Sequence, residues 1–334
     1  METLPAHESP SVRHDGNGPA MLDAGPPAHG GATAWATQQR PTVMDLLADH
    51  GAVLVRGLGI ASADDLADIA TALGVTPMIE REAFAPRSSY PRGVYSSSQW
   101  PADEPMCMHH ELSYADVVPG LLMFGCLRAA RDGGDTAVAD SQELLRQLPP
   151  TIVDRFRREG WLLSRVYHEA GVPWQEAFGT ADRASVAAYC EAAGLDHEWL
   201  PGDRLLTRQR RAAVVRHPGT GVPVWFNQVA FLNEHTLDPD VREYLLEVYG
   251  ALPFNTAFGD GGELDRPTIE TINERYRAAS AAQPWRDGDL LLVDNLRMAH
   301  SREPYEGDRE ILVLLGNPVR LTDHMPSRTA AEGA

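Results

Sequence analysis

The sequence has little cysteine and no long hydrophobic run, and each shortage excludes a class of protein. Its three cysteines, Cys107, Cys126 and Cys190, are odd in number and lack CxxC spacing. Such a set indicates neither a disulfide framework nor a zinc ribbon, and it fits a reducing compartment. No apolar run approaches the roughly 20 residues that span a bilayer, and the first ten residues do not resemble a signal peptide. We therefore expect a cytoplasmic protein with no membrane partner.

Basic residues are scarce relative to acidic ones, which argues against a nucleic-acid partner. The 334 residues include 29 Lys and Arg against 47 Asp and Glu, for a net charge of −18. A nucleic-acid binder would carry a basic patch. Gly-rich phosphate loops and a Gly-x-Ser-x-Gly nucleophile elbow are also absent, so neither a nucleotide-binding loop nor a serine hydrolase is indicated.

The two ends of the chain differ in composition from its middle. Residues 1–33 are rich in Pro, Gly, Ala and His and contain almost no aliphatic cluster. Such a segment cannot bury enough apolar surface to offset the entropy lost on ordering. We predict a disordered tail over 1–33, one domain over 34–320 and a flexible tail over 321–334.

Within the predicted domain, strand and helix patterns follow one another without regular alternation. Short apolar runs predict strands, and capped stripes of helical spacing predict helices between them. This mixture favours an α+β protein built on a β-sandwich or jelly-roll barrel. The clearest strands lie at 52–57, 121–127, 161–167, 290–294 and 311–315, and the clearest helices at 62–74, 182–194, 238–250 and 268–279.

Two short segments far apart in the sequence carry metal-binding side chains. His109 and Glu111 are two positions apart, so on a strand they would project from the same face. His300 would arrive from a distant strand. Two imidazoles and one carboxylate suit iron(II) and leave three positions of an octahedral ion open. His110 would face the opposite way, as a packed or supporting histidine.

Two further residues suit a carboxylate ligand. Thr136 follows the Gly133-Gly134 turn, where its hydroxyl can be presented without steric cost. Arg309 comes nine residues after His300, and a guanidinium fork binds a carboxylate through two charge-assisted hydrogen bonds. Read alone, Arg309 could equally form a surface ion pair. Together with the metal residues, the pair indicates a dicarboxylate cosubstrate.

Several stretches jointly resemble the taurine dioxygenase and 2,4-dichlorophenoxyacetate dioxygenase-like group of iron(II)/2-oxoglutarate oxygenases, related to clavaminate synthase. The resemblance covers the chain from about residue 43 to residue 318. It is carried by Gly51–Gly57, His109–Tyr114, Gly133–Thr136, Trp225–Gln228 and Asp294–Pro304.

The resemblance implies a double-stranded β-helix, or jelly-roll, core with flanking and inserted helices. It also implies that His109, Glu111 and His300 hold Fe(II), while Thr136 and Arg309 bind the distal carboxylate of 2-oxoglutarate. O2 would be the second cosubstrate, and oxidative decarboxylation to succinate would drive hydroxylation of an unactivated C–H bond. Desaturation or cyclisation would need the same residues.

Two departures from the family pattern bear on the reaction and the substrate. Glu111 stands where many members have Asp, as in the clavaminate synthase branch, and its carboxylate argues against halogenation. Val313 stands where some members carry a second arginine near the substrate, which argues against a sulfonate such as taurine.

The segments Trp174–Gly179 and Trp225–Gln228 look most like hydroxylases of nonribosomal peptide and amino-acid pathways. This resemblance suggests antibiotic biosynthesis, with an amino acid or a carrier-protein-bound aminoacyl group as the small-molecule substrate. Polar groups in segments near the barrel mouth are the candidate substrate contacts: Arg92, Tyr95, Ser97 and Asn227.

Readings of other classes stay open. A non-oxygenase metal-binding jelly-roll protein, such as a cupin-like isomerase or a zinc hydrolase, would keep the three ligands without needing Arg309 and Thr136. A non-catalytic relative would act as a binding module. The sequence also leaves open whether the chain forms a homo-oligomer. Asn295 and Arg297 are expected to brace the loop before His300.

Overall fold

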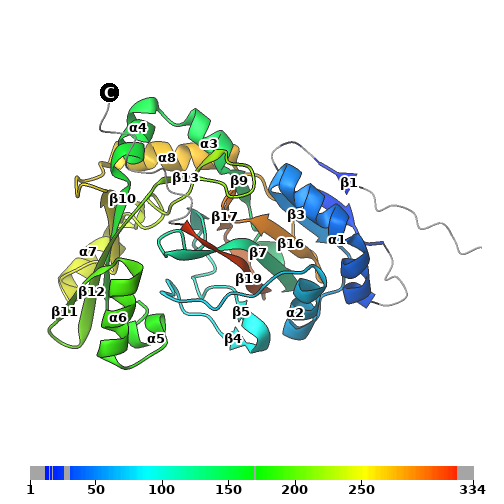
Figure 1. Cartoon of the computed structure of the whole chain (residues 1–334), viewed down its shortest axis with the longest axis horizontal. Coiled ribbons are helices and arrows are strands. Elements are labelled where there is room, and N and C mark those ends of the chain that lie inside the picture. The colour runs from blue at the N-terminus through cyan, green and yellow to red at the C-terminus, as the bar shows by residue number, and fades with distance from the viewer. Residues whose placement is uncertain (1–11, 15, 17, 26–30, 169–170, 322–334) are drawn as a thin grey trace, which may run out of the picture.

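The computed structural model describes residues 12–14, 16, 18–25, 31–168 and 171–321, and two sheets organise it (Figure 1). The eight strands of the larger sheet follow the order β1-β2-β3-β16-β7-β19-β5-β4, and a three-stranded sheet has the order β6-β17-β9. In the larger sheet these strands are β1 (Val12–Arg13), β2 (Ala20–Asp23), β3 (Ala52–Arg56), β16 (Leu290–Asp294), β7 (Val117–Arg128), β19 (Glu310–Arg320), β5 (Val94–Ser96) and β4 (Ser89–Tyr90). In the smaller sheet they are β6 (Met106–His109), β17 (Met298–Arg302) and β9 (Val138–Asp140).

The larger sheet buries side chains on both faces because its central strands are apolar at nearly every position. On β16, Leu291 and Val293 join a core that also contains Ala139 of β9 and Met298 of β17. Leu290 and Leu292 join a second core on the opposite face. Since successive side chains of a strand point to opposite faces, one strand serves both cores. The first core fills the space between the two sheets, as in a jelly roll.

Two helices cover the outer face of the larger sheet. They are α1 (Gly31–His50) and α2 (Ala63–Ala72), which lie beside this sheet in Figure 1. As the sequence predicts, Ser62 caps α2: its hydroxyl accepts a hydrogen bond from the backbone N–H of Asp65 at 3.2 Å. The buried residues Leu66, Ile69 and Ala70 of α2 pack into the second core.

A third sheet, of four strands, has its own small core. Its order is β11-β12-β10-β15, and α5 and α6 supply Trp174, Phe178 and Val186 to a cluster with Tyr167 and Leu205. The bounds are β10 (Trp161–Tyr167), as the sequence predicts, α5 (Trp174–Phe178), α6 (Arg183–Ala193), β11 (Asp196–Leu200), β12 (Arg204–Arg211) and β15 (Phe254–Phe258).

The other α-helices and strands lie outside these three sheets. They are β8 (Asp132–Gly133), α3 (Ser141–Gln147), α4 (Pro150–Glu159), β13 (Val214–Arg216), β14 (Pro223–Trp225), α7 (Pro239–Tyr249), α8 (Arg266–Ala279) and β18 (Tyr305–Glu306).

The N-terminal segment differs from the disordered tail predicted for 1–33. Residues 20–23 form β2, which pairs in parallel with β3 and places Leu22 opposite Val55. Ala20 and Leu22 are fully buried. The sheet supplies both the backbone hydrogen bonds and the apolar neighbours, so a segment with few aliphatic residues can be ordered. Residues 1–11, and 322–334 of the predicted C-terminal tail, lie outside the described residues, whereas Leu321 is buried.

Helix α7 forms where the sequence predicts it but leaves its apolar stripe in solvent. Asp238 caps it by accepting hydrogen bonds from the backbone N–H groups of the first turn. Val241, Tyr244 and Val248 are 49%, 57% and 53% exposed. Helical spacing of apolar residues therefore identified the helix correctly, but it did not identify a packing partner.

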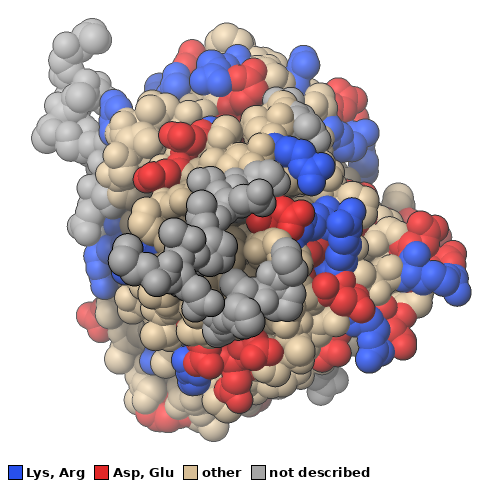
Figure 2. All heavy atoms as spheres, turned by 90° about the vertical axis from the view of Figure 1, so that its right-hand side faces the viewer, with Lys and Arg blue, Asp and Glu red and all other residues tan. Residues whose placement is uncertain are grey.

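Charged side chains of both signs are interspersed over the face drawn in Figure 2. All 29 basic residues of the chain are arginines, because the sequence contains no lysine. Within the ranges that the structure describes, no helix is both long enough and apolar enough to cross a membrane.

The position of β2 predicts that Leu22 contributes to stability. Replacing a fully buried leucine by alanine removes apolar contacts and leaves a cavity, so Leu22→Ala should lower the free energy of unfolding by about 2–5 kcal/mol. Urea unfolding followed by circular dichroism measures the difference. Val12, which is 46% exposed on β1, offers the matched control Val12→Ala with a change within about 0.5 kcal/mol. Equal, small effects at both positions would contradict an ordered β2.

Candidate metal centre and cosubstrate pocket

Three side chains from the two distant sequence segments meet at the smaller sheet. One ligand atom from each of His109, Glu111 and His300 lies within 4.8 Å of the others, and all three residues are buried. The Oε2 atom of Glu111 lies 3.9 Å from Nε2 of His109 and 3.7 Å from Nε2 of His300. Within the described part of the chain, these three side chains form a group whose ligand atoms are close enough together to hold one metal ion.

Strand pairing places the two histidines, whereas a side-chain clamp places the carboxylate. His109 ends β6 and pairs with His300 of β17 in antiparallel register. Glu111 lies in the turn after β6, which corrects the expectation that both residues of the motif share a strand. The side chain of Asn295 accepts from the backbone N–H of Glu111 at 2.8 Å and donates to its carbonyl at 3.0 Å. This clamp fixes the turn that carries the carboxylate.

The two candidate imidazoles are oriented toward one point. Nδ1 of His109 donates to the carbonyl of Cys107 at 2.8 Å, which leaves the Nε2 lone pair for a metal. His300 packs against His109, with ring centroids 4.2 Å apart, and against Phe124 at 5.3 Å. Phe231 stacks on the ring of His109 at 4.9 Å. Burial lowers the pKa of both histidines, so both are neutral and able to bind a cation at pH 7.

His110 has the supporting role that the sequence predicts. Its Nδ1 donates to the carbonyl of Asn295 at 2.6 Å, and its Nε2 accepts from the hydroxyl of Ser141 at 2.7 Å. Burial lowers its pKa to about 4. Both ring nitrogens are therefore used inside the protein, and neither is available to a metal.

The residues predicted to bind a dicarboxylate line the same cavity as the three ligands. This cavity, of about 50 Å³, is bounded by Thr136 and Arg309 together with His109, Glu111 and His300. Nε of Arg309 donates to the carbonyl of Gly134 at 2.9 Å, and Trp285 donates to the hydroxyl of Thr136 at 3.2 Å. Burial, followed by the charge of Arg302, lowers the pKa of Arg309 to about 10, so the guanidinium is charged at pH 7.

The four predicted substrate contacts have different surroundings. Ser97 lines the metal cavity. Arg92 instead lies on the surface, where Nη1 forms an ion pair with Asp68 at 2.6 Å. The hydroxyl of Tyr95 accepts a hydrogen bond from the backbone N–H of Glu80. The buried side chain of Asn227 donates to the carbonyl of Ala213 and accepts from the backbone N–H of Val229. Of the four residues predicted from their polar character, Ser97 alone lines the metal cavity. The other three form their hydrogen bonds or ion pairs with other parts of the protein.

Arg87 is a site residue that the motif analysis missed. Its Nη2 donates to Oε1 of Glu111 at 2.9 Å, and its Nε lies 3.4 Å from Oε2 of Glu80. The side chain is 6% exposed and lines the metal cavity. Arg87 precedes Glu111 by 24 positions in an irregular segment, so neither spacing nor periodicity indicated it.

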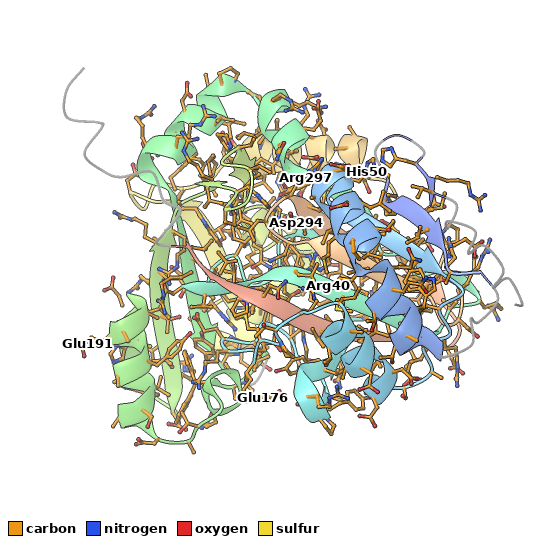
Figure 3. All side chains as sticks on the ribbon, turned by 45° about the vertical axis from the view of Figure 1, so that its right-hand side comes forward. Arg40, His50, Glu176, Glu191, Asp294 and Arg297 are labelled. Atoms are coloured by element: carbon orange, nitrogen blue, oxygen red, sulfur yellow. The ribbon has the colours of Figure 1, made fainter. Side chains whose placement is uncertain are left out.

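Residues of the loop before His300 act as scaffold, as expected. Arg297 donates from Nε to Asp140 at 3.0 Å and from Nη1 to the carbonyls of Ala48 and Asp49 at the end of α1. Figure 3 shows Arg297 and Asp294 beside the helix that carries His50. These bonds hold the loop between β16 and β17 against the helix that covers the larger sheet.

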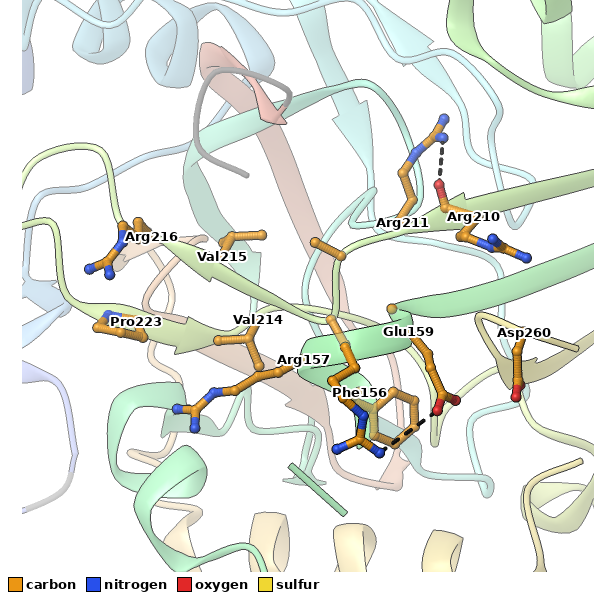
Figure 4. A pocket seen from close by; sticks show the side chains of 14 residues that line it. Phe156, Arg157, Glu159, Arg210, Arg211, Val214, Val215, Arg216, Pro223 and Asp260 are labelled. Atoms are coloured by element: carbon orange, nitrogen blue, oxygen red, sulfur yellow. Dashed lines mark hydrogen bonds and ion pairs between the residues drawn. The ribbon is translucent and has the colours of Figure 1, made fainter. Parts of the chain in front are cut away.

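A second, larger hollow of about 780 Å³ is not the chemical site. It is a surface groove between the end of α4 and strands β12 to β14 (Figure 4). Arg157, Arg210 and Arg216 line it with Val214 and Val215, and no predicted site residue does. The small cavity carries the ligand set, so the chemistry of its lining identifies the site better than volume does.

Comparison with known proteins gives consistent results. A profile described as "Taurine catabolism dioxygenase TauD, TfdA family" matches residues 25–315. The chain is 33% identical over 278 residues to the dapdiamide synthesis protein DdaC of Enterobacter agglomerans, covering 82% of this chain and 84% of that protein. It is 28% identical over 290 residues to a clavaminate synthase-like protein of Arabidopsis thaliana, covering 83% and 84%.

Solved structures show the same fold. PvcB of Pseudomonas aeruginosa matches with a TM-score of 0.55 and 16% identity over 98% of both chains. A second PvcB structure, described as "an Fe, alpha-ketoglutarate dependent oxygenase from an isonitrile synthetic pathway", matches with a TM-score of 0.54 and 17% identity over 98% and 99%. The predicted α+β fold with a jelly-roll core is confirmed.

The buried histidines predict a definite pH dependence of stability in the metal-free protein. Burial lowers the pKa of His109, His110 and His300 below the ordinary value of 6.5. The unfolded chain therefore binds protons first as the pH falls below about 6.5, and protonation favours unfolding. The free energy of unfolding should fall between pH 6.5 and 5, by up to about 1.4 kcal/mol per pH unit for each histidine. Urea unfolding with a chelator at pH 7.5, 6.5 and 5.5 measures this slope.

A histidine variant tests whether the pH dependence of the unfolding free energy comes from this site. His300→Gln lacks one of the three groups, so its unfolding free energy should depend less steeply on pH by up to one proton. Stability that stays level or rises from pH 6.5 to 5 would show that these imidazoles are not buried as neutral groups.

Proposed function

Because the chain belongs to the taurine catabolism dioxygenase TauD, TfdA family, whose enzymes use iron(II) and 2-oxoglutarate, we propose that His109, Glu111 and His300 hold its iron. The chain is accordingly a 2-oxoglutarate-dependent dioxygenase. One observation carries the assignment of the site: the three ligand atoms converge within 4.8 Å in the cavity that Thr136 and Arg309 also line.

The donor set fits the metal. Two neutral imidazoles and one carboxylate, with no thiolate among them, are the ligands of facial iron(II) sites that keep positions open. Bound iron(II) supplies the redox chemistry by which O2 decarboxylates 2-oxoglutarate to succinate and oxidises a substrate C–H bond. His109, Glu111 and His300 orient that ion from one side of the cavity.

Arg309 and Thr136 bind the distal carboxylate of 2-oxoglutarate in this proposal. The bond from Nε of Arg309 to Gly134 fixes the plane of the guanidinium and leaves its two Nη groups as donors. Thr136 accepts a hydrogen bond from Trp285, so its own hydroxyl proton is left for a carboxylate oxygen. Phe124 and Phe231 pack on the candidate ligand histidines and limit the access of water.

The proposed substrate is an amino acid, free or as an aminoacyl group bound to a carrier protein, in a natural-product pathway. The names of two relatives support this class: one is a dapdiamide synthesis protein, and the other comes from an isonitrile synthetic pathway. The proposed outcome is hydroxylation of an unactivated C–H bond. Desaturation or cyclisation is the alternative outcome of the same cofactor chemistry.

Thr136 and Arg309 also weigh against a metal-binding jelly-roll protein of another class. An isomerase or a zinc hydrolase has no need of a buried, charged guanidinium 2.9 Å from a backbone carbonyl beside its metal ligands. We further propose that the enzyme acts in the cytoplasm and without a nucleic-acid partner.

Succinate formation tests the proposal. Protein reconstituted anaerobically with Fe(II) should convert 2-oxoglutarate to succinate in air, faster when its substrate is present, across a panel of free amino acids. His300→Ala removes one of three ligands and should abolish iron binding and succinate formation.

The pattern of outcomes discriminates the alternatives. Stimulated succinate formation that is lost in His300→Ala supports the oxygenase and names the substrate class. Iron binding with slow, unstimulated succinate formation supports the cofactor chemistry with a carrier-bound substrate. Failure to bind iron and to form succinate would exclude the proposed function.

Affinity for 2-oxoglutarate tests the cosubstrate residues. Arg309→Leu removes a buried charge partner, a loss of about 2 kcal/mol or more, so the KM for 2-oxoglutarate should rise about 30-fold or more. Thr136→Val removes one neutral hydrogen bond and should raise KM by about 2- to 10-fold. Arg128→Leu, at a side chain 57% exposed, is the control and should leave KM unchanged. Similar KM values in all three variants would contradict the assignment of Arg309.

A further inference from the structure

The two oxygens of the Glu111 carboxylate have different partners. Oε2 faces Nε2 of His109 at 3.9 Å and Nε2 of His300 at 3.7 Å. Oε1 accepts a hydrogen bond from Nη2 of Arg87 at 2.9 Å. One oxygen is therefore directed toward the candidate metal position, and the other is held by a buried guanidinium.

We propose that Arg87 is a positioning residue that keeps Glu111 a ligand through one oxygen. The inference rests on the proposed function, because it concerns the ion that His109, Glu111 and His300 would hold. A carboxylate can bind a metal ion through one oxygen or through both. Arg87 occupies Oε1 and leaves Oε2 as the donor.

The number of oxygens that bind decides how many positions stay open. Three protein donors would leave three positions of an octahedral ion, enough for a bidentate 2-oxoglutarate and O2. If Oε1 of Glu111 also bound, only two positions would remain. A bidentate 2-oxoglutarate would then fill both, no position would be left for O2, and the bound 2-oxoglutarate would be converted to succinate more slowly.

Arg87 can hold Oε1 because it is charged, buried and paired on both sides. An arginine guanidinium stays protonated in proteins, and this one faces the carboxylates of Glu111 and Glu80 at 2.9 and 3.4 Å. A charge-assisted hydrogen bond of this kind is about twice as strong as a neutral one. Because the Arg87 side chain is only 6% exposed, solvent screens its ion pair with Glu111 little.

The segment that carries Arg87 is fixed independently of the metal. Arg165, itself buried, donates to the carbonyls of Glu82 and Ala83 at 2.9 Å each. The backbone of Gln99 donates to the carbonyl of Pro86 at 2.9 Å. The backbone before Arg87 is thus held by hydrogen bonds to residues other than Glu111 and the two histidines.

Arg165 also provides the matched control, since it anchors the same segment without contacting the carboxylate. A purely structural role of Arg87 would be shared by Arg165, and the two arginines would then have the same effects. A positioning role belongs to Arg87 alone.

The test compares Arg87→Met, Arg87→Lys and Arg165→Met with the unaltered protein. Two readouts are measured besides succinate formation: the visible absorption of the Co(II)-substituted protein, which reports the coordination number, and anaerobic 2-oxoglutarate binding to the Fe(II) protein, followed by its charge-transfer absorption. In Arg87→Met, Co(II) should bind with a spectrum of altered coordination, 2-oxoglutarate should still bind, and the rate of succinate formation at saturating 2-oxoglutarate should fall about 10- to 100-fold. Arg87→Lys retains the charge and should recover part of that rate.

The remaining outcomes can be distinguished from one another. An unchanged Co(II) spectrum and an unchanged rate of succinate formation in Arg87→Met would overturn the inference and leave the proposed function intact. Equal losses in Arg87→Met and Arg165→Met would overturn it in favour of a structural role. If Arg87→Met does not fold, the Arg87→Lys protein decides. The succinate rate and Co(II) spectrum of the unaltered protein overturn the inference, and a reduced succinate rate with an altered spectrum supports it. Failure of the unaltered protein to bind Co(II) or Fe(II) would overturn the proposed function and the inference together.

Discussion

The clamp that Asn295 forms on the turn after β6 is the interaction on which the site depends. Its side chain binds the backbone N–H and carbonyl of Glu111 and the carbonyl of Pro119, and its own carbonyl accepts from His110. Asn295 is fully buried, so these bonds are not exchanged with water. They join segments 184 positions apart and place a carboxylate that strand geometry alone would not aim at the histidines.

Charge in the cavity is divided between two arginines with different tasks. The guanidinium of Arg87 is already paired within the protein, with the carboxylates of Glu111 and Glu80. Burial nevertheless raises the pKa of Glu80 to about 7, and Arg87 opposes that shift. Arg309 has no carboxylate partner among the residues that the structure describes, and its hydrogen bond goes to the carbonyl of Gly134. In the proposed site, Arg87 orients a ligand of the metal and Arg309 is left to bind the distal carboxylate of 2-oxoglutarate.

The sequence predicted those parts of the molecule that local patterns encode. The sequence predicted β10 with its observed bounds, and the cap at Ser62 placed the start of α2. The same logic failed where an element depends on a partner distant in sequence. β2 is ordered by β3, and Arg92 pairs with Asp68 on α2 instead of facing the cavity. Arg87 belongs to an irregular segment held by Arg165, which no local pattern reports.

The sequence by itself determined the family, the jelly-roll fold and the chemical types at the site, because two histidines, a carboxylate, a threonine and an arginine in this order suit few other reactions. Tertiary structure decided which atoms meet. It brought His109 and His300 into register, set Glu111 in a turn, and added Arg87 to the carboxylate. The physical reason is that residue type and spacing fix what a side chain can do, whereas long-range hydrogen bonds and burial fix where it points.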